Sequence, residues 1–248
     1  MDMNLKESFL SLWRRYFNNA ELPIAYWYAD APGDAELMTA GSGPRCIIGG
    51  LVRVRNGASL AYTAESVGCP GGRKYLGFSE GLMPNFEYFL SCGIPGEMEG
   101  ERYKKTPELV KEAMEEWPSF KAPASHIVFK RWDNLAAADA PEVVVFFAQP
   151  DVISGLFTLA SFDEAVGTMN TTPFGSGCSS IIQYPYLESR KEHPGTVIGM
   201  FDVSARPYVP ADTLTFAAPM LKFDRMVANM PESFLTTESW RKVQKRIK

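Results

Sequence analysis

The sequence predicts a single α+β (or α/β) domain with a mixed sheet and flanking helices. Segments rich in strand-forming residues alternate along the chain with segments of helical periodicity. A chain of 248 residues can bury a substantial core, and no low-complexity linker divides it. Its hydrophobic content of 46% and charged content of 22% are those of an ordinary globular protein. These observations favour one domain over two.

The first part of the chain opens with an amphipathic helix. Its apolar residues recur on a helical period, and they are Phe9, Leu10, Leu12, Trp13 and Phe17. Strands are expected over 23–30 and 60–64. Helices are expected from Cys46 to Gly57, over 73–78 and 86–91, and over 108–117, where Thr106-Pro107 starts the helix and Pro118 stops it.

The second part of the chain repeats this rhythm. Strands are expected over 127–130, 143–148, 196–202 and 214–216, and helices over 153–165, 221–230 and 238–247, the last capped by Thr236 or Thr237. In each portion we expect, in chain order, a strand, a glycine-rich turn, a cysteine at a helix start, a strand and a second turn. The second turn holds Cys69 in the first portion and 200–202 in the second. The pattern suggests a degenerate internal duplication of a strand–helix–strand unit, with an N-terminal helix in 1–20, halves at 21–120 and 121–230, and a C-terminal helix in 231–248.

Composition also limits the compartment and the partners. No apolar run approaches the roughly 20 residues that cross a bilayer, and the start of the chain lacks the pattern of an export signal. We therefore expect a soluble, cytoplasmic protein without a membrane anchor. The formal net charge of −4 gives no basic footprint, so nucleic acid is not an expected partner.

Cysteine is the most informative residue type in this chain. All four cysteines, Cys46, Cys69, Cys92 and Cys178, stand beside glycine, proline or serine turns and not inside apolar runs. The cytoplasm keeps thiols reduced, so free thiols, metal ligands or redox groups are expected in preference to disulfides. A cysteine in the first turn of a helix is activated, because unpaired N–H groups and the helix dipole favour the thiolate.

Converging thiolates repel one another unless a cation lies between them. An iron–sulfur cluster or zinc supplies that cation. The candidate ligands are Cys46, Cys69 and Cys178, with Cys92 as the fourth. The alternative is that the cysteines are small buried hydrophobic residues packed at tight turns.

A second set of residues indicates an anion-binding site. The turn 68–74 resembles a backbone nest, in which Gly71 and Gly72 offer N–H groups and Arg73 a charge. The turn 175–180, with Ser179, has the same character, and Arg45 and Arg206 are further candidate anion ligands. The alternative for each of these turns is a plain turn that binds nothing. The charged segment 100–105 is expected to be a solvated loop, and its alternative is a lid over the site. With only two histidines, a thiol enzyme using Cys69 or Cys178 as nucleophile lacks an evident base.

The order of these residues resembles the domain-of-unknown-function family 169. The matching positions are Arg45, Cys46, Cys69, Leu76, Gly77, Phe78, Cys178 and Pro185. The segment 199–206 keeps the glycine and the arginine of a Gly-Cys-x-Gly-Cys-Arg-like segment but has no cysteine, so Cys92 or Asp202 would have to substitute if a cofactor is kept. The resemblance implies the fold unit and the cysteine set, and no settled activity.

Two functions follow as expectations. The first is a cysteine-lined pocket that holds an iron–sulfur cluster or another thiolate-ligated metal and serves a redox partner. The second is a binder of a small anionic molecule, gripped by arginines, in which the cysteines only pack.

Overall fold

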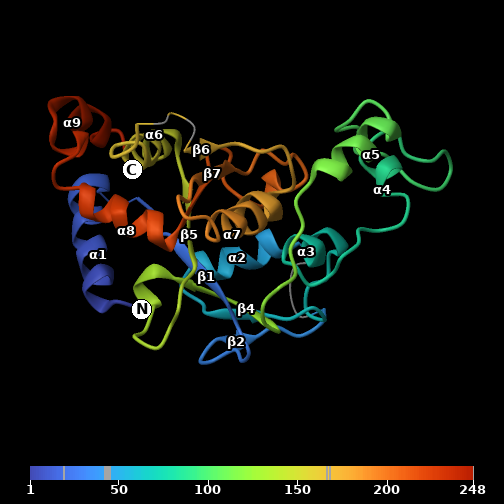
Figure 1. Ribbon diagram of the computed structural model, residues 1–248, viewed down its shortest axis with the longest axis horizontal. Helices are drawn as coiled ribbons and strands as arrows, with labels where there is room; N and C mark the ends of the chain where they lie inside the picture. Colours follow the sequence, from blue (N-terminus) through green and yellow to red (C-terminus); the bar gives the residue numbers. More distant parts are fainter. Residues whose placement is uncertain (19, 42–45, 166, 168, 248) are drawn as a thin grey trace.

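The computed structural model describes residues 1–18, 20–41, 46–165, 167 and 169–247. Within them, eight strands form one mixed sheet in the order β2-β3-β4-β1-β5-β8-β7-β6 (Figure 1). The strands are β1 Ile24–Ala29, β2 Glu36–Leu37, β3 Leu60–Tyr62, β4 His126–Arg131, β5 Val143–Ala148, β6 Asn170–Thr171, β7 Thr196–Gly199 and β8 Leu214–Pro219.

The sheet consists of two halves with the same topology. In the first half β2 pairs parallel with β3, β3 antiparallel with β4, and β4 antiparallel with β1. In the second half β6, β7, β8 and β5 repeat these three pairings in the same order. The halves meet where β1 pairs antiparallel with β5, with Ala25 opposite Val144. The internal repeat expected from the sequence is thus present in the strand topology, and the α+β class is confirmed.

Helices cover both faces of the sheet, because residues along the central strands alternate between two cores. One core includes Val144 and Phe146 of β5 and packs against α1 Met3–Phe17, α6 Pro150–Ala160, α8 Met220–Asn229 and α9 Glu238–Gln244. Phe9 of α1 is fully buried there, with its ring centroid 5.1 Å from that of Phe223. This face carries no cysteine.

The opposite face carries the helices that begin at cysteines. They are α2 Ile47–Arg55, α3 Pro70–Tyr75, the π-helical turn η2 Ser179–Gln183 and its continuation α7 Tyr184–Glu188. Their core includes Val143, Val145 and Phe147 of β5. The glycine-rich start of α2 packs closely on the sheet, since a methyl group at Gly50 would overlap the hydroxyl of Tyr62 on β3. The 3₁₀ turn η3 Arg206–Tyr208 packs against α2.

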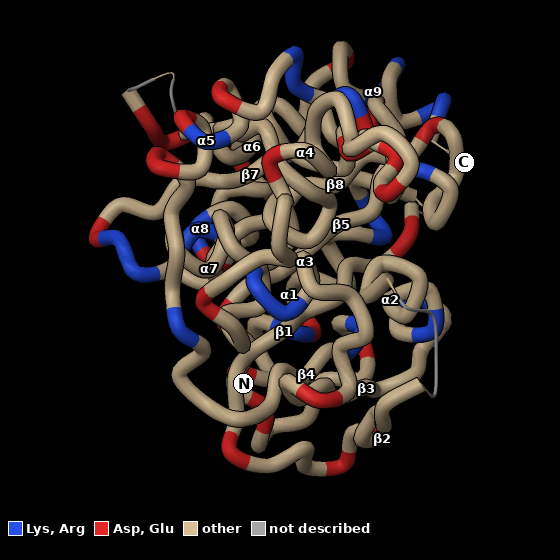
Figure 2. The backbone as a smooth tube through the Cα atoms, turned by 90° about the vertical axis from the view of Figure 1, so that its right-hand side faces the viewer, with Lys and Arg blue, Asp and Glu red and all other residues tan. Residues whose placement is uncertain are grey.

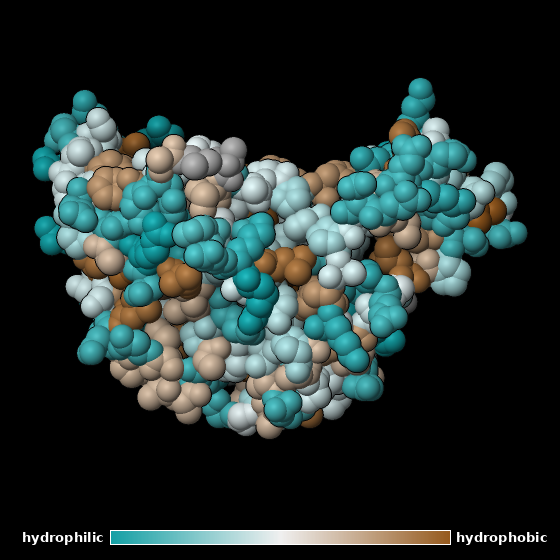
Figure 3. Space-filling view, viewed as in Figure 1, coloured by the Kyte–Doolittle hydropathy of each residue, from teal (hydrophilic) through white to brown (hydrophobic). Residues whose placement is uncertain are grey.

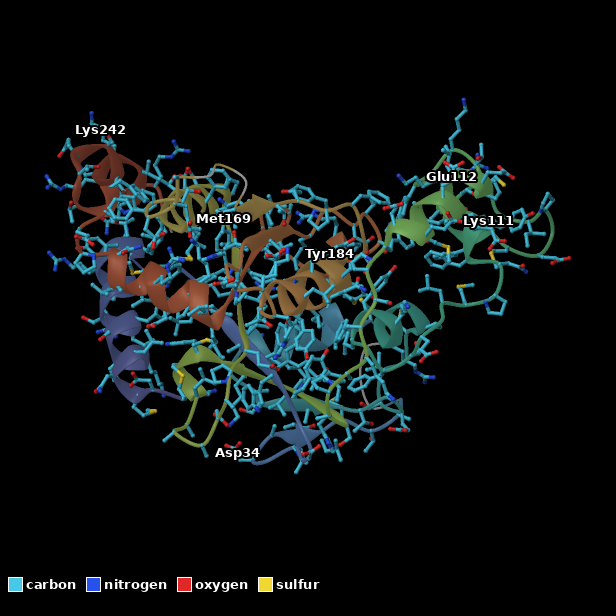
Figure 4. All side chains as sticks on the ribbon, in the orientation of Figure 1. Asp34, Lys111, Glu112, Met169, Tyr184 and Lys242 are labelled. Atoms are coloured by element: carbon cyan, nitrogen blue, oxygen red, sulfur yellow. The ribbon has the colours of Figure 1, made fainter. Side chains whose placement is uncertain are left out.

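A lobe formed by residues 82–117 projects from this body (Figures 1 and 3). It contains α4 Phe86–Phe89 and α5 Pro107–Glu116 and has a small core of its own, built on Phe86, Leu90 and Val110. Figure 4 places Lys111 and Glu112 of α5 in this lobe, apart from Tyr184 in the middle of the body. The lobe is inserted between α3 and β4, whereas α6 is inserted between β5 and β6. The two insertions are what make the halves unequal.

Charged residues of both signs are dispersed over the side of the molecule drawn in Figure 2. Among the described residues, no helix is both long enough and apolar enough to span a membrane.

Candidate functional site

Three of the four cysteines lie at helix starts. Cys46 is the N-cap of α2 and Cys69 the N-cap of α3, whereas Cys178 lies in the first helical turn, which begins at Gly177 and continues as η2. All three cysteines thus stand at helix starts, as the sequence predicts, and the N–H groups of Ile48 and Gly49 in the first turn of α2 face the Cys46 sulfur.

Local sequence explains why these helices begin where they do. Pro70 follows Cys69 and suits the first helical position, where its missing N–H costs nothing. After Cys178 the chain forms a π-turn in which the N–H of Tyr184 donates to the carbonyl of Ser179. Pro185 has no N–H to donate to the preceding turn. The carbonyl of Ile182 in that turn accepts a hydrogen bond from the hydroxyl of Tyr26 at 2.8 Å. Such π-turns are frequent at functional sites.

Cys46 and Cys178 form an interacting pair of sulfurs from the two halves of the sheet. The Cys178 thiol hydrogen-bonds Cys46 and lowers the pKa of Cys46 from its ordinary value to about 6, although burial acts in the opposite direction. The backbone N–H groups of Ile48 and Gly49, at the start of α2, lower this pKa further. Cys46 is therefore largely thiolate at neutral pH.

Cys178 has the opposite protonation preference. Its hydrogen bond to Cys46 and its burial raise the pKa of its thiol well above the ordinary value, and the charges of Cys46, Cys69 and Asp202 raise it further. Two like charges about 4 Å apart repel by about 4 kcal/mol at the effective dielectric of a protein surface. Without a cation, the pair therefore holds one proton between two sulfurs.

Tyrosines and glycines complete the surroundings of the sulfurs. Tyr75 of α3 is buried, and burial raises its pKa, as do the nearby charges of Cys178, Tyr184, Asp202 and Cys69 in that order. A methyl group at Gly71 would lie 3.8 Å from the Cys69 sulfur. One at Gly177, just before Cys178, would lie 3.5 Å from both Ile48 of α2 and the Met200 sulfur. At Gly177 the added methyl group would also lie 3.0 Å from the Cβ of Ala205, so glycine permits the close approach of the Cys178 loop to residue 205.

Asp202 fixes the loop that carries Cys178. One carboxylate oxygen accepts the N–H of Gly177 at 2.9 Å, and the other accepts the N–H and the hydroxyl of Ser204 at 3.0 and 2.7 Å. Both oxygens are thus engaged, which makes Asp202 a positioning residue and a poor candidate for the missing metal ligand.

The structure does not bring the remaining predicted residues into this site. Cys92 is exposed and follows α4 in the lobe, whose small core includes none of the other three cysteines. The hydroxyl of Ser179 is buried and donates to the Ser176 carbonyl within its own turn. Gly72 is buried against Val67. Arg45 lies outside the described residues.

Arg73 and Arg206, the two arginines of the predicted anion site that the structure describes, donate hydrogen bonds to backbone carbonyls. Arg73 donates to the carbonyl of Val67 at 2.8 Å. The guanidinium of Arg206 donates to the carbonyls of Met200, Thr213, Pro210 and Ala211. It holds the loop 200–213 together and has little capacity left for a ligand.

The segment 101–104 connects the lobe to the edge of the site. Its backbone N–H groups donate to carbonyls of Phe89, Leu90 and Ser91, so it belongs to the lobe. Its side chains reach the body: the Lys104 ammonium lies 4.5 Å from the ring centroid of Phe174, in the loop leading to Cys178. The buried hydroxyl of Tyr103 lies beside Ser204 and makes no hydrogen bond within the described residues. The segment is therefore not a fully solvated loop, and its role as a lid over the site stays a prediction.

In the part of the chain that the structure describes, no three His, Cys, Asp or Glu side chains are placed to hold one metal ion. The metal-ligand role of Cys46, Cys69 and Cys178 therefore stays a prediction.

Comparison with known proteins gives one result. Residues 15–229 match the model of domain-of-unknown-function family 169, described as "Uncharacterised ArCR". No curated protein and no solved structure matches the chain. The family match covers most of the sequence and both halves of the sheet, and the chain therefore belongs to domain-of-unknown-function family 169.

Proposed function

We propose that Cys46, Cys69 and Cys178 bind an iron–sulfur cluster, and that the protein uses it in electron transfer or in sensing within the reducing cytoplasm. The observation that supports this proposal is the placement of three cysteines at helix starts from both halves of the sheet, with Cys46 held as a thiolate. Thiolates are the usual ligands of such clusters. The cluster would supply the positive charge that the sulfur pair lacks.

The chain's own residues have three roles in this proposal. The start of α2 stabilises the charge on Cys46, since the N–H groups of Ile48 and Gly49 face its sulfur. Asp202 holds the turn before Cys178 through the N–H of Gly177. Tyr75 of α3 is buried beside Cys178 and Cys69, and in this proposal it would shield that side of the cluster from water. A redox partner or a small molecule is the corresponding class of partner.

The binder of a small anion has less support. Its expected ligands include Arg73 and Arg206, and both guanidinium groups donate to backbone carbonyls. Anion binding through Arg206 would require its loop contacts to break, whereas Arg73 uses only its Nε–H for the Val67 carbonyl.

The decisive experiment is anaerobic purification followed by absorption spectroscopy and analysis of iron, zinc and acid-labile sulfide. Wild type is compared with the variants Cys46→Ala, Cys69→Ala and Cys178→Ala, and Cys92→Ala is the matched control. We expect iron and sulfide in wild type and in Cys92→Ala, and their loss from the other three variants. Zinc without sulfide would indicate a structural metal site. A metal-free wild type that also resists reconstitution would refute the proposal and point to thiol chemistry at Cys46.

A further inference from the structure

The sulfurs of Cys46 and Cys178 are in direct contact through a hydrogen bond. The helix starts that carry them also pack together, since a methyl group at Gly177 would lie 3.5 Å from the side chain of Ile48. A disulfide bond is about 2 Å long, and two sulfurs in hydrogen-bonding contact reach that separation by rotation of their side chains. The geometry therefore permits a covalent bond between these two cysteines.

The two sulfurs differ in what can reach them. Cys46 is half-buried, so a small molecule in solution can approach its sulfur. Cys178 is only 6% exposed and belongs to a buried cluster with Ile48, Met200 and Ala205. An incoming reactant therefore meets Cys46 first, and Cys178 reacts with the sulfur beside it.

We propose that Cys46 and Cys178 form a dithiol–disulfide couple that reduces low-molecular-weight disulfides by exchange. Cys46 is the attacking sulfur because it is accessible, and Cys178 is the resolving sulfur because it is buried in contact with Cys46. A small disulfide is the class that fits, since its sulfur must reach a half-buried thiolate. The inference goes beyond the proposed function and does not rest on it, because it concerns the metal-free protein.

The exchange proceeds in two steps. The thiolate of Cys46 attacks one sulfur of the substrate, the substrate S–S bond breaks, and one thiolate leaves. The thiol of Cys178 then passes its proton to that thiolate and attacks the sulfur of Cys46, so the mixed disulfide breaks and a second thiolate leaves. The substrate gains two electrons and becomes two thiols, whereas the cysteine pair loses two electrons and becomes a disulfide. An excess of a low-molecular-weight thiol returns the pair to the reduced form by the reverse exchange.

The other cysteines serve as controls for this pairing. Cys69 stands at the start of α3 and acts on Cys178 through its charge, whereas Cys46 acts on Cys178 through a hydrogen bond. Cys92 is exposed in the lobe. Replacement of either residue should therefore leave the couple intact.

The test traps the intermediate of the exchange. Wild type and the variants Cys178→Ala, Cys46→Ala, Cys69→Ala and Cys92→Ala are freed of metal with a chelator and mixed with oxidised glutathione. Each reaction is quenched with acid, and the intact mass and the peptide map are recorded. In wild type, Cys69→Ala and Cys92→Ala we expect a peptide that links Cys46 to Cys178 and two molecules of glutathione released per chain. In Cys178→Ala we expect a glutathione adduct to accumulate on Cys46, and in Cys46→Ala we expect Cys178 to stay reduced.

Three results for wild type would overturn the inference. They are a chain that stays fully reduced, a glutathione adduct on Cys46 that is never resolved, and a link from Cys46 to Cys69 in place of Cys178. The wild-type peptide map decides between these outcomes even if Cys178→Ala fails to fold. The result is also separate from that of the cluster proposal, which is tested by iron uptake. A linked pair in a protein that takes up no iron supports the couple alone, and iron uptake without a linked pair in the metal-free chain supports the cluster alone.

Discussion

The thiol of Cys178 donates a hydrogen bond to the sulfur of Cys46, and each residue stands at the start of the helix that joins the two parallel strands of its half of the sheet. The pair is symmetric in position but not in charge. Cys46 is half-buried and sits beside the N–H groups of α2, whereas Cys178 is buried. The environment therefore assigns the negative charge to Cys46 and the proton to Cys178.

The first prediction concerns the reactivity of Cys46. The thiolate is the nucleophile, so alkylation of metal-free protein by iodoacetamide should be half-maximal near pH 6 at Cys46. In Cys178→Ala the midpoint should move upward, toward the value of about 8.5 for a free cysteine, because the hydrogen-bond donor is lost. Peptide mass spectrometry after timed labelling measures both midpoints. Cys92→Ala should keep the wild-type midpoint, and an unchanged midpoint in Cys178→Ala would contradict the pairing.

The second prediction concerns the pH dependence of stability. The pKa of Cys46 is lower in the folded than in the unfolded chain, so the unfolded chain binds more protons here between pH about 6 and about 8.5. The free energy of unfolding should rise with pH across this window, and the contribution of Cys46 is lost as pH falls through about 6. Cys178 acts in the opposite sense: its pKa is raised on folding, so its contribution is lost as pH rises above about 8.5. Urea unfolding of metal-free wild type and Cys46→Ser under reducing conditions measures this, and a pH-independent difference between the two proteins would refute it.

The third prediction separates the charge of Asp202 from its hydrogen bonds. Asp202→Asn should lose about 1–2 kcal/mol of unfolding free energy, because charge-assisted hydrogen bonds are weakened. It should also lower the pKa of Cys46 further, since the carboxylate charge raises it. Ser204→Ala is the control, as it removes one hydrogen bond and keeps the charge. That variant should lose stability without moving the labelling midpoint of Cys46, and a midpoint shift of equal size in both variants would show that the charge is not the cause.

The fourth prediction tests the close approach of α2 to the sheet. Gly50→Ala should cost about 1–3 kcal/mol of unfolding free energy, because the added methyl group overlaps the Tyr62 hydroxyl. Tyr62→Phe alone should be close to neutral, since that buried hydroxyl has no hydrogen bond among the described residues. The double variant should recover part of the loss, and urea denaturation of the four proteins measures the coupling. Purely additive losses would mean that the two groups do not meet.

Much of this architecture could be predicted from residue patterns. Apolar periodicity and turn residues located α1, α5 and the central strands, and the spacing of cysteine and glycine indicated the repeat before any pairing was known. Cys46, Cys69 and Cys178 could be placed at helix starts because Pro70 and the glycine-rich turns mark those boundaries.

What could not be predicted depends on contacts distant in sequence. Arg206 resembled an anion ligand because a guanidinium after a strand often is one, but the carbonyls of Thr213 and Ala211 occupy it. Cys92 has the same turn-like neighbours as the other cysteines, and only the tertiary structure places it in the lobe.

Because Cys46 and Cys178 come from opposite halves of one sheet, the site has no local precursor during synthesis. A ribosome-bound chain that ends before β8 would lack the strand that joins β5 to β7. The first half could fold early and expose Cys46 without its partner. The Cys46–Cys178 pair would therefore form only after the second half of the sheet is complete, so the strand order sets when the two sulfurs meet.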